Sequence, residues 1–175
     1  TQLGPVISKE LRDNILKYIH DTESLGGTIL CGGKIPNNMS NGYFIEPTII
    51  TNITQDMPIY KDELFGPVVV CLPFNDENDA VKMANNSPFG LGASIWTNNI
   101  KIGHRMADKI DYGIIWINDH HKNDPSSPWS GHKNSGINRE NGIDSLLEYT
   151  QRKSVIINYD EQTMDWFSNK NARIG

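Results

Sequence analysis

The sequence predicts an α/β domain built around a parallel sheet. Segments with strand-like and helix-like periodicity alternate along the chain, and the run 68–72 is continuously apolar with three valines. Such a run is typical of a strand covered on both faces, so we expect it to lie centrally in the sheet. The length of 175 residues fits one domain with short appendages.

The first third of the chain predicts a helix, a strand and an extended segment. Ser8 can cap a helix whose apolar residues recur at three- and four-residue spacings, and Gly26-Gly27 ends it. A short strand is expected at 28–31. The polar segment 34–42, with its proline and Asn-Gly pair, predicts a surface loop, and 43–50 is expected to be extended.

The middle of the chain alternates helix and strand. Residues 75–85 predict a helix with an acidic first turn, and 99–110 predict a second helix. Strands are expected at 93–97 and 113–118, on either side of the second helix. Parallel strands need a crossover connection, so this alternation indicates parallel pairing.

The last third is less regular. Residues 119–138 show no periodicity and contain prolines, glycines and serines, which predicts a long ordered loop. Long loops inside compact domains usually carry function. A short helix is expected at 143–150, a final β-rich run at 154–159, and an irregular tail at 160–175.

Charge and composition argue against two classes of protein. The 16 basic and 21 acidic residues give a net charge of −5 and are scattered along the chain, so no nucleic-acid surface is expected. No run approaches the roughly 20 apolar residues that cross a bilayer, and the first residues lack a signal-peptide pattern. We therefore expect a cytoplasmic protein that binds small molecules or other proteins, without nucleic acid or membrane.

Two groups of reactive residues are predicted to be structural. Cys31 and Cys71 lie in short apolar runs, where a thiol behaves as a small hydrophobic side chain, so neither a disulfide nor a nucleophile is expected. A second group, in the predicted loop, is Asp119, His120, His121 and Asp124. Adjacent histidines seldom chelate one ion without a third ligand fixed by secondary structure, so no metal is predicted.

A series of short blocks runs through the chain. The blocks are Gly4-Pro5, Gly42-Tyr43-Phe44-Ile45-Glu46-Pro47-Thr48, Glu63-Leu64-Phe65-Gly66-Pro67, Gly90-Leu91, Trp116-Ile117-Asn118, Pro128-Trp129-Ser130-Gly131-His132-Lys133, Ser135-Gly136, Arg139-Glu140 and Lys153-Ser154-Val155. One such block arises easily by chance, whereas the whole series in order does not. In order and spacing the blocks resemble the aldehyde dehydrogenase superfamily, over about residues 4 to 158.

The resemblance implies an architecture and an activity. Residues 1–152 would be the C-terminal part of a parallel-sheet catalytic domain of aldehyde dehydrogenase type, followed by a C-terminal oligomerisation strand at 153–159. The family oxidises aldehydes with a cysteine nucleophile, a glutamate base and NAD or NADP held on an N-terminal Rossmann-like domain. Those parts lie upstream of the matched blocks, and no Gly-rich dinucleotide turn occurs here. We therefore expect an enzyme segment that is inactive alone.

The resemblance assigns cofactor contacts to three residues. Glu63 matches a glutamate that accepts hydrogen bonds from the nicotinamide ribose. Phe65 matches a phenylalanine that lies against the nicotinamide ring, and Leu91 matches a residue that packs near this ring. A carboxylate can accept from two vicinal hydroxyls, and hydride transfer needs the ring held close to its donor. On local sequence alone, Glu63 is an ordinary loop glutamate and Leu91 an ordinary core leucine.

Trp129, His121 and Asn123 match positions that line the substrate tunnel in this family. Tryptophan at the first position resembles the betaine aldehyde dehydrogenases, whose aldehyde carries a quaternary ammonium. An indole face attracts such a cation by about 0.5 to 2 kcal/mol. Other members with tryptophan there take uncharged aldehydes, and His121 and Asn123 replace aromatic or apolar residues, so the substrate class stays open.

Glu140 matches a proposed proton relay, although an Arg139-Glu140 pair beside a helix start is also typical of a structural ion pair. Ser154 to Tyr159 matches a strand that adds to another subunit's sheet, which predicts a homo-oligomer; the alternative is a strand that closes this chain's own sheet. Two other functions stay open. One is a stand-alone, non-catalytic oligomerisation module, and the other is a related enzyme that passes the acyl group to coenzyme A or phosphate.

Overall fold

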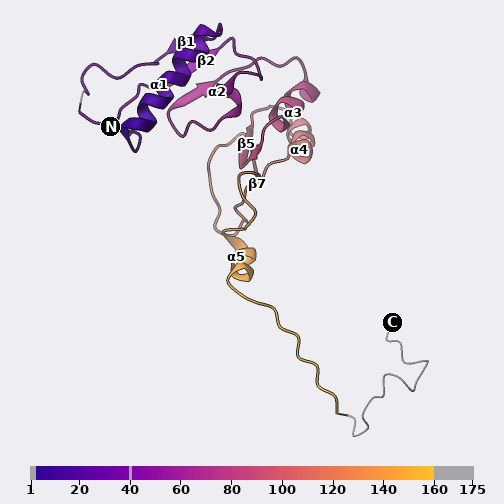
Figure 1. Cartoon of the computed structure of the whole chain (residues 1–175). Coiled ribbons are helices and arrows are strands. Elements are labelled where there is room, and N and C mark those ends of the chain that lie inside the picture. Colours follow the sequence, from indigo (N-terminus) through magenta and orange to yellow (C-terminus); the bar gives the residue numbers. More distant parts are fainter. Residues whose placement is uncertain (1–2, 40, 160–175) are drawn as a thin grey trace, which may run out of the picture.

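The computed structural model describes residues 3–39 and 41–159. In chain order the elements are α1 (Lys9–Ser24), β1 (Thr28–Cys31), β2 (Thr48–Thr51), α2 (Pro58–Lys61), β3 (Val68–Val70), α3 (Glu77–Asn85), β4 (Phe89–Gly90), β5 (Gly92–Ile95), α4 (Ile100–Lys109), β6 (Ile114–Ile117), β7 (His132–Lys133) and α5 (Gly142–Glu148). Elements α1 to β3 form one half of the globular part and α3 to β7 the other, with α5 and an extended segment beyond them (Figure 1). The tail predicted at 160–175 lies outside the described residues.

Helix α1 forms as the sequence predicts. The Ser8 hydroxyl accepts a hydrogen bond from the backbone N–H of Leu11 at 3.1 Å, which satisfies a donor that the first helical turn leaves unpaired. At the other end, Gly26 has φ +100°, and the Gly27 N–H donates to the Thr22 carbonyl at 2.9 Å. The helix therefore begins and ends close to the predicted residues.

The first half contains most of the buried core. Strand β1 pairs antiparallel with β2, and β2 pairs parallel with β3. The buried cluster is Ile15, Ile19, Ile45, Ile50, Ile53 and Ile59. Residues at spacing four on α1 thus meet the inner face of β2, and burying each isoleucine stabilises the fold by about 1.5 to 3 kcal/mol.

Strand β3 is an edge strand in this chain, contrary to the central position predicted. Among the described residues it pairs only with β2, and Val69 is 59% exposed. Its direct partner Ile49 is also exposed. Cys31 and Cys71, which lie in apolar runs of the sequence, are free and exposed as well. The apolar run correctly predicted a strand, but no described residue of this chain covers the outer face of the sheet.

The second half contains the predicted strand–helix–strand unit. Strands β5 and β6 pair in parallel, with Gly92 opposite Ile114 and Ile95 opposite Ile117, and α4 connects them. Helix α4 packs closely on β6, because a Cβ added at Gly103 would lie 3.1 Å from the Ile117 side chain. This half confirms the parallel α/β class.

The predicted long loop after β6 is ordered and contains one element that its sequence does not indicate. Strand β7 pairs antiparallel with β4, with Phe89 opposite Lys133 and Gly90 opposite His132. A two-residue strand has too few positions to show alternation, which explains why the pattern missed it. The pairing brings the segment around Trp129 onto the end of the second half.

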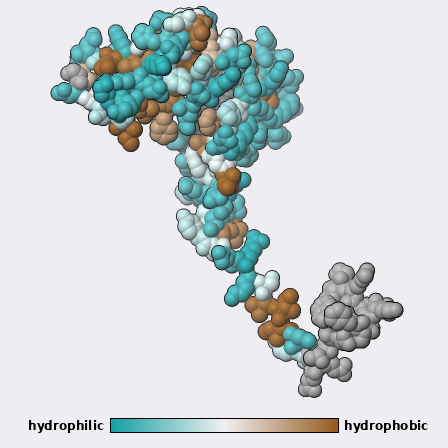
Figure 2. Space-filling view, in the orientation of Figure 1, coloured by the Kyte–Doolittle hydropathy of each residue, from teal (hydrophilic) through white to brown (hydrophobic). Residues whose placement is uncertain are grey.

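The segment after α5 is extended and exposed. It carries the apolar residues Val155, Ile156 and Ile157, of which Ile156 is 94% exposed, and Figure 2 shows this patch on the C-terminal segment. Residues 154–159 are not part of a strand within 3–39 and 41–159. Their role between subunits stays a prediction. No helix within 3–39 or 41–159 combines the length and apolarity needed to cross a membrane.

Candidate functional site

Three adjoining pockets hold most of the predicted site residues. The Glu63 pocket, about 410 Å³, is lined by Tyr60, Lys61, Asp62, Glu63, Phe89, Leu91, Gly92, Tyr112, Asn134 and Ser135. The Leu91 pocket, about 310 Å³, is lined by Leu91, Trp129, Ser130, Gly131, Ser135, Gly136, Ile137, Asn138 and Glu140. The Trp129 pocket, about 330 Å³, is lined by Gly113, Ile114, Ile115, Trp116, Lys122, Asn123, Asp124, Ser127, Pro128, Trp129 and Asn141. Leu91 lines the first two and Trp129 the last two.

The loop between α2 and β3 positions Glu63 and Phe65. The Glu63 side chain is exposed, and its carboxylate accepts no hydrogen bond from the described residues, so its oxygens are available to a ligand. Phe65 is 78% exposed and lines none of the three pockets. Its φ of +52° is unfavourable for a bulky side chain, by about 1 to 2 kcal/mol, and no packing of the ring compensates for this.

Four rings gather beside the Trp129 pocket. The Trp129 ring lies 6.0 Å from the Trp116 ring and 5.9 Å from the His121 ring, the latter edge to face at 87°. His120 lies 5.8 Å from Trp116, and its Nδ1 is 2.9 Å from the Ser94 hydroxyl. These spacings are typical of favourable aromatic pairs. The four rings form an aromatic wall that includes the predicted residue His121, and the predicted residue Asn123 lines the adjacent Trp129 pocket.

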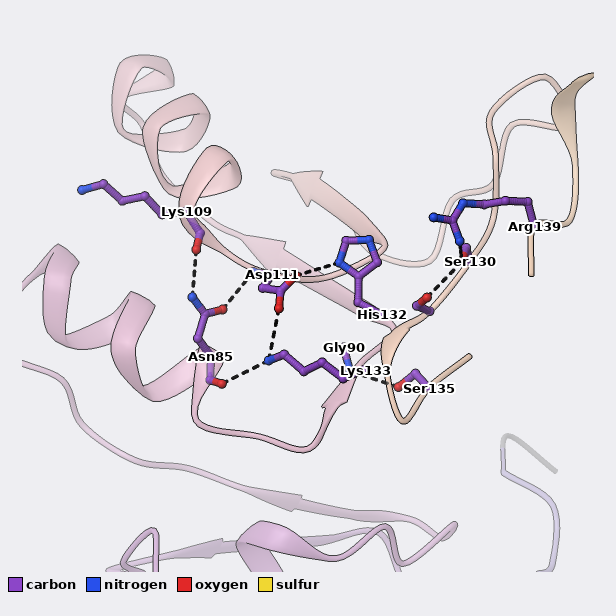
Figure 3. A network of polar contacts seen from close by, with 10 residues as sticks. Asn85, Gly90, Lys109, Asp111, Ser130, His132, Lys133, Ser135 and Arg139 are labelled. Carbon is purple, nitrogen blue, oxygen red and sulfur yellow. Dashed lines mark hydrogen bonds and ion pairs between the residues drawn. The ribbon is translucent and has the colours of Figure 1, made fainter. Parts of the chain in front are cut away.

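The segment that follows Trp129 is tied to residues 139 and 140. The backbones of Trp129 and Glu140 exchange two hydrogen bonds, of 2.6 and 2.8 Å. The Arg139 guanidinium donates to the buried Ser130 hydroxyl, as Figure 3 shows. The structural ion pair predicted between Arg139 and Glu140 is therefore wrong, because Arg139 turns toward Ser130 and the Ile137 carbonyl.

A network of hydrogen bonds anchors strand β7 to α3 and to the turn between α4 and β6. Asp111 lies 2.9 Å from His132 Nδ1, and the Lys133 ammonium donates to the Asn85 carbonyl at 3.1 Å (Figure 3). Asn85 in turn accepts from the Asp111 N–H at 2.9 Å. The Lys133 ammonium also lies 5.5 Å from the Tyr112 ring centre. Residues from α3, the α4–β6 turn and β7 thus hold strand β7 in place.

The titratable groups of the pockets differ in their surroundings. Burial raises the pKa of Tyr60 and of Tyr112, both in the Glu63 pocket, so both phenols are neutral at physiological pH. The Tyr60 hydroxyl donates to the Met83 carbonyl at 2.8 Å. Hydrogen bonds from the Ser126 N–H and hydroxyl lower the pKa of Asp124, which keeps this carboxylate charged beside the aromatic wall.

The prediction missed Trp116, whose indole N–H donates to the Lys122 carbonyl at 2.9 Å and so fixes the loop that carries His121 and Asn123. A signal existed, because Trp116 and Ile117 end strand β6 and ligands of α/β sheets bind at the carboxyl ends of strands. Within residues 3–39 and 41–159, no three or more His, Cys, Asp or Glu side chains gather as metal ligands would.

Comparison with known proteins identifies similar sequences. Residues 1–155 match the model of the aldehyde dehydrogenase family. Betaine aldehyde dehydrogenase of Brucella anthropi is 43% identical over 159 residues, which are 90% of this chain and 33% of that protein. The putative aldehyde dehydrogenase DhaS of Bacillus subtilis is 38% identical over 161 residues, covering 92% of this chain and 32% of that protein.

Solved structures show the same relationship. Betaine aldehyde dehydrogenase of Staphylococcus aureus in complex with NAD+ superposes with a TM-score of 0.91 at 41% identity, covering 97% of this chain and 34% of that one. An NAD+ complex of aldehyde dehydrogenase from Bacillus cereus gives 0.86 at 44% identity, covering 91% and 32%. The chain spans about one third of the length of these relatives.

Proposed function

The chain belongs to the aldehyde dehydrogenase family, and we propose that the enzyme containing it oxidises an aldehyde to a carboxylic acid with NAD as hydride acceptor. One observation carries the proposal: Leu91 connects the Glu63 pocket to the Leu91 pocket, and Trp129 connects the latter to the Trp129 pocket. Residues predicted to contact cofactor and residues predicted to contact aldehyde thus adjoin, as hydride transfer requires.

On the cofactor side, Glu63 would accept hydrogen bonds from the two ribose hydroxyls next to the nicotinamide. Its unpaired, exposed carboxylate fits that role, and the apolar Leu91 in the same pocket fits a ring. The left-handed backbone of Phe65 supports a ligand role, because strain without compensating packing concentrates at functional sites. NAD, when bound, takes the hydride; relatives solved with NAD+ support this choice over NADP.

On the substrate side, Trp129 would form one wall, with His121 and Asn123 at its edge. We propose a quaternary ammonium aldehyde such as betaine aldehyde as the substrate. The faces of Trp129 and Trp116 and the charged Asp124 carboxylate in the same pocket are suited to a cation, and two compared relatives are betaine aldehyde dehydrogenases. Glu140 contributes its backbone to this wall, and its carboxylate stays a weaker candidate for a proton relay.

The covalent chemistry would come from elsewhere in the enzyme. A thiolate must attack the aldehyde carbon, and water must then release the acid from the acyl-enzyme after the hydride has left. Neither Cys31 nor Cys71 lines any of the three pockets. We therefore propose that the 175-residue chain alone does not oxidise aldehydes, and that a complete enzyme joins it to the nucleophile and to the rest of the NAD site.

We further propose that the enzyme is a homo-oligomer joined through Ser154 to Tyr159. The support is the exposed apolar run in this segment, where Val155, Ile156 and Ile157 are 62 to 94% exposed. An extended segment with exposed apolar side chains is suited to strand addition to another chain.

The test is Glu63→Gln in the complete enzyme. The substitution keeps size and hydrogen-bonding reach but removes the charge, and the lost charge-assisted bonds are worth about 1.5 to 3 kcal/mol, or roughly 10- to 150-fold in the hydride step. We expect a larger isotope effect with deuterated aldehyde and near-normal hydrolysis of an ester substrate. Glu148→Gln, at an exposed site outside the pockets, is the matched control.

The two activities separate the explanations. If Glu63 only stabilises the fold, the melting temperature and both activities of Glu63→Gln fall together. An unchanged isotope effect with reduced stability would remove Glu63 from the cofactor site. Absence of any aldehyde oxidation by the wild-type enzyme would reject the proposed reaction itself.

A further inference from the structure

We propose that Arg139 is a positioning residue for the substrate wall: its guanidinium fixes Trp129 through Ser130 and through the backbone bridge between Trp129 and Glu140. The inference rests on the proposed function, because the proposed cationic aldehyde is the substrate that the aromatic wall would bind. It assigns the discrimination between cationic and neutral aldehydes partly to a residue that need not touch either one.

The first support is the geometry of the bridge. Trp129 and Glu140 exchange hydrogen bonds of 2.6 and 2.8 Å, so the backbone that carries the indole is paired on only one side, to the residue next to Arg139. The bridge is isolated and continues into no strand. A single pair of backbone bonds defines position weakly, and a neighbouring side-chain contact is needed to fix it.

The second support is the contact between Arg139 and Ser130. Ser130 is 6% exposed, and its hydroxyl donates its one proton to the Gly131 carbonyl at 3.0 Å. The hydroxyl oxygen can then only accept, and the arginine guanidinium is a donor without acceptor capacity. Arg139 supplies that donor, and a bond with a charged partner is stronger than a neutral one (Figure 3).

The third support is the packing on the other side of Ser130. A Cβ added at Gly113 would lie 1.8 Å from the Ser130 carbonyl oxygen, and one added at Gly131 would lie 2.5 Å from Ser135. The segment 130–131 is therefore pressed against the start of β6 and the turn after β7. Arg139 contacts Ser130 from the segment that follows this turn, so Ser130 is held from there as well.

The consequence concerns the indole of Trp129. Its ring lies 6.0 Å from Trp116 and 5.9 Å from His121, and it separates two pockets. Cation–π attraction depends on the cation facing the ring within about 6 Å. Releasing Ser130 would let the ring leave that orientation, which weakens binding of a cationic aldehyde and leaves a neutral aldehyde of the same shape nearly unaffected.

The test compares betaine aldehyde with 3,3-dimethylbutanal, its uncharged isostere, in the complete enzyme. The measured quantity is the ratio of kcat/KM for the two aldehydes. Loss of cation–π attraction predicts that Trp129→Ala lowers this ratio by about 2- to 30-fold. Arg139→Met should lower it several-fold without exceeding Trp129→Ala, mainly through KM for betaine aldehyde. Ser130→Ala should do the same, and Arg139→Lys should restore part of the loss.

A double-mutant cycle separates positioning from general damage. If Arg139 acts through the indole, Arg139→Met has no further effect on the ratio once Trp129 is alanine. Arg105→Met is the matched control, because it removes an arginine ion-paired to Glu77 between α3 and α4, away from the pockets. Equal losses for both aldehydes in Arg139→Met, or an undiminished effect in the Trp129→Ala background, would overturn the proposal.

A second measurement is independent of catalysis. The 175-residue chain has four tryptophans, so 5-fluorotryptophan labelling gives four ¹⁹F resonances, assigned by Trp→Phe substitutions. Arg139→Met should shift or broaden the Trp129 resonance and leave that of Trp96 in place. An unmoved Trp129 resonance overturns the positioning role. If the wild-type enzyme oxidises no aldehyde but the resonance moves, the proposed function fails while the positioning of Trp129 stands.

Discussion

Adding one methyl group at Gly113 should disturb both the stability of the fold and the substrate wall. In Gly113→Ala the new Cβ would lie 1.8 Å from the Ser130 carbonyl oxygen and 2.7 Å from its carbonyl carbon. Both are backbone atoms, so no side-chain rotation relieves the contact. Gly113 itself cannot retreat freely, because its N–H donates to the Gly90 carbonyl at 3.0 Å. The segment around Ser130 must therefore move.

The size of the effect follows from these distances. Cβ contacts below 3.0 Å are essentially absent from real structures, so the new Cβ and the Ser130 carbonyl must separate by at least the difference between 3.0 and 1.8 Å, which is 1.2 Å. Overpacking of this kind costs about 1 to 3 kcal/mol, and a backbone contact belongs at the upper end. For a chain of this size, about 3 kcal/mol corresponds to a fall in Tm of roughly 6 to 12 °C. A shift of about 1 Å in a positioning group can also cost on the order of 100-fold in rate.

The assay is thermal or urea unfolding of the 175-residue chain, combined with the ¹⁹F resonance of Trp129. Gly4→Ala is the matched control, since a Cβ there meets nothing within 4 Å, and its unfolding free energy should change by less than about 0.5 kcal/mol. The reasoning is refuted if Gly113→Ala unfolds at the wild-type temperature with an unmoved Trp129 resonance. That result would mean that residues 129–131 do not press on Gly113.

Two further predictions concern stability and assembly. Hydrogen bonds from the Arg105 guanidinium lower the pKa of Glu77 in the folded chain. The pair therefore stabilises the fold above the ordinary glutamate pKa of about 4.3, and this stabilisation is lost as the pH falls through the lower pKa of the folded state. The Tm of Glu77→Gln should therefore drop less between pH 6 and pH 3 than the Tm of wild type. Ile156 is 94% exposed, so Ile156→Asp should change the unfolding free energy by less than about 0.5 kcal/mol but reduce self-association in sedimentation. By contrast, Ile15→Ala in the core should lower the unfolding free energy by about 2 to 5 kcal/mol. An oligomer that persists in Ile156→Asp would show that the subunits meet at another surface.

The elements that local chemistry defines were predictable from the sequence. Helix α1 has a serine cap, regular apolar spacing and a Gly-Gly end, and it spans Lys9–Ser24 close to the predicted residues. The β5–α4–β6 unit was likewise predicted, in parallel pairing. The edge position of β3 was not predictable from the sequence. An apolar strand indicates only that both of its faces are buried in the assembled protein, whereas Val69 is exposed in the described part of this chain.

The sequence indicated candidate site residues but not how their surfaces adjoin, and the binding roles of these residues stay predictions. The resemblance placed Glu63, Leu91 and Trp129 in a site, and the structure puts them along three adjoining pockets. The contact of Arg139 with Ser130 joins residues nine apart across an irregular loop, where no periodicity indicates which side chains meet. Trp116 was missed because a tryptophan at the end of an apolar strand has the sequence pattern of a core residue.

The division of the fold into two halves has a consequence for the evolution of specificity. The predicted ribose clamp, Glu63, lies in the first half, and the aromatic wall around Trp129 lies in the second. Among the described residues, two hydrogen bonds join residues 3–72 to the second half: the Tyr60 hydroxyl to the Met83 carbonyl, and Asn86 to Gln55. Exchanging residues 73–149 between homologous enzymes would therefore break few hydrogen bonds between the halves, but it would replace Leu91, Tyr112 and the other second-half residues that line the Glu63 pocket. A change of the aromatic wall by such an exchange would thus alter the predicted cofactor pocket at the same time.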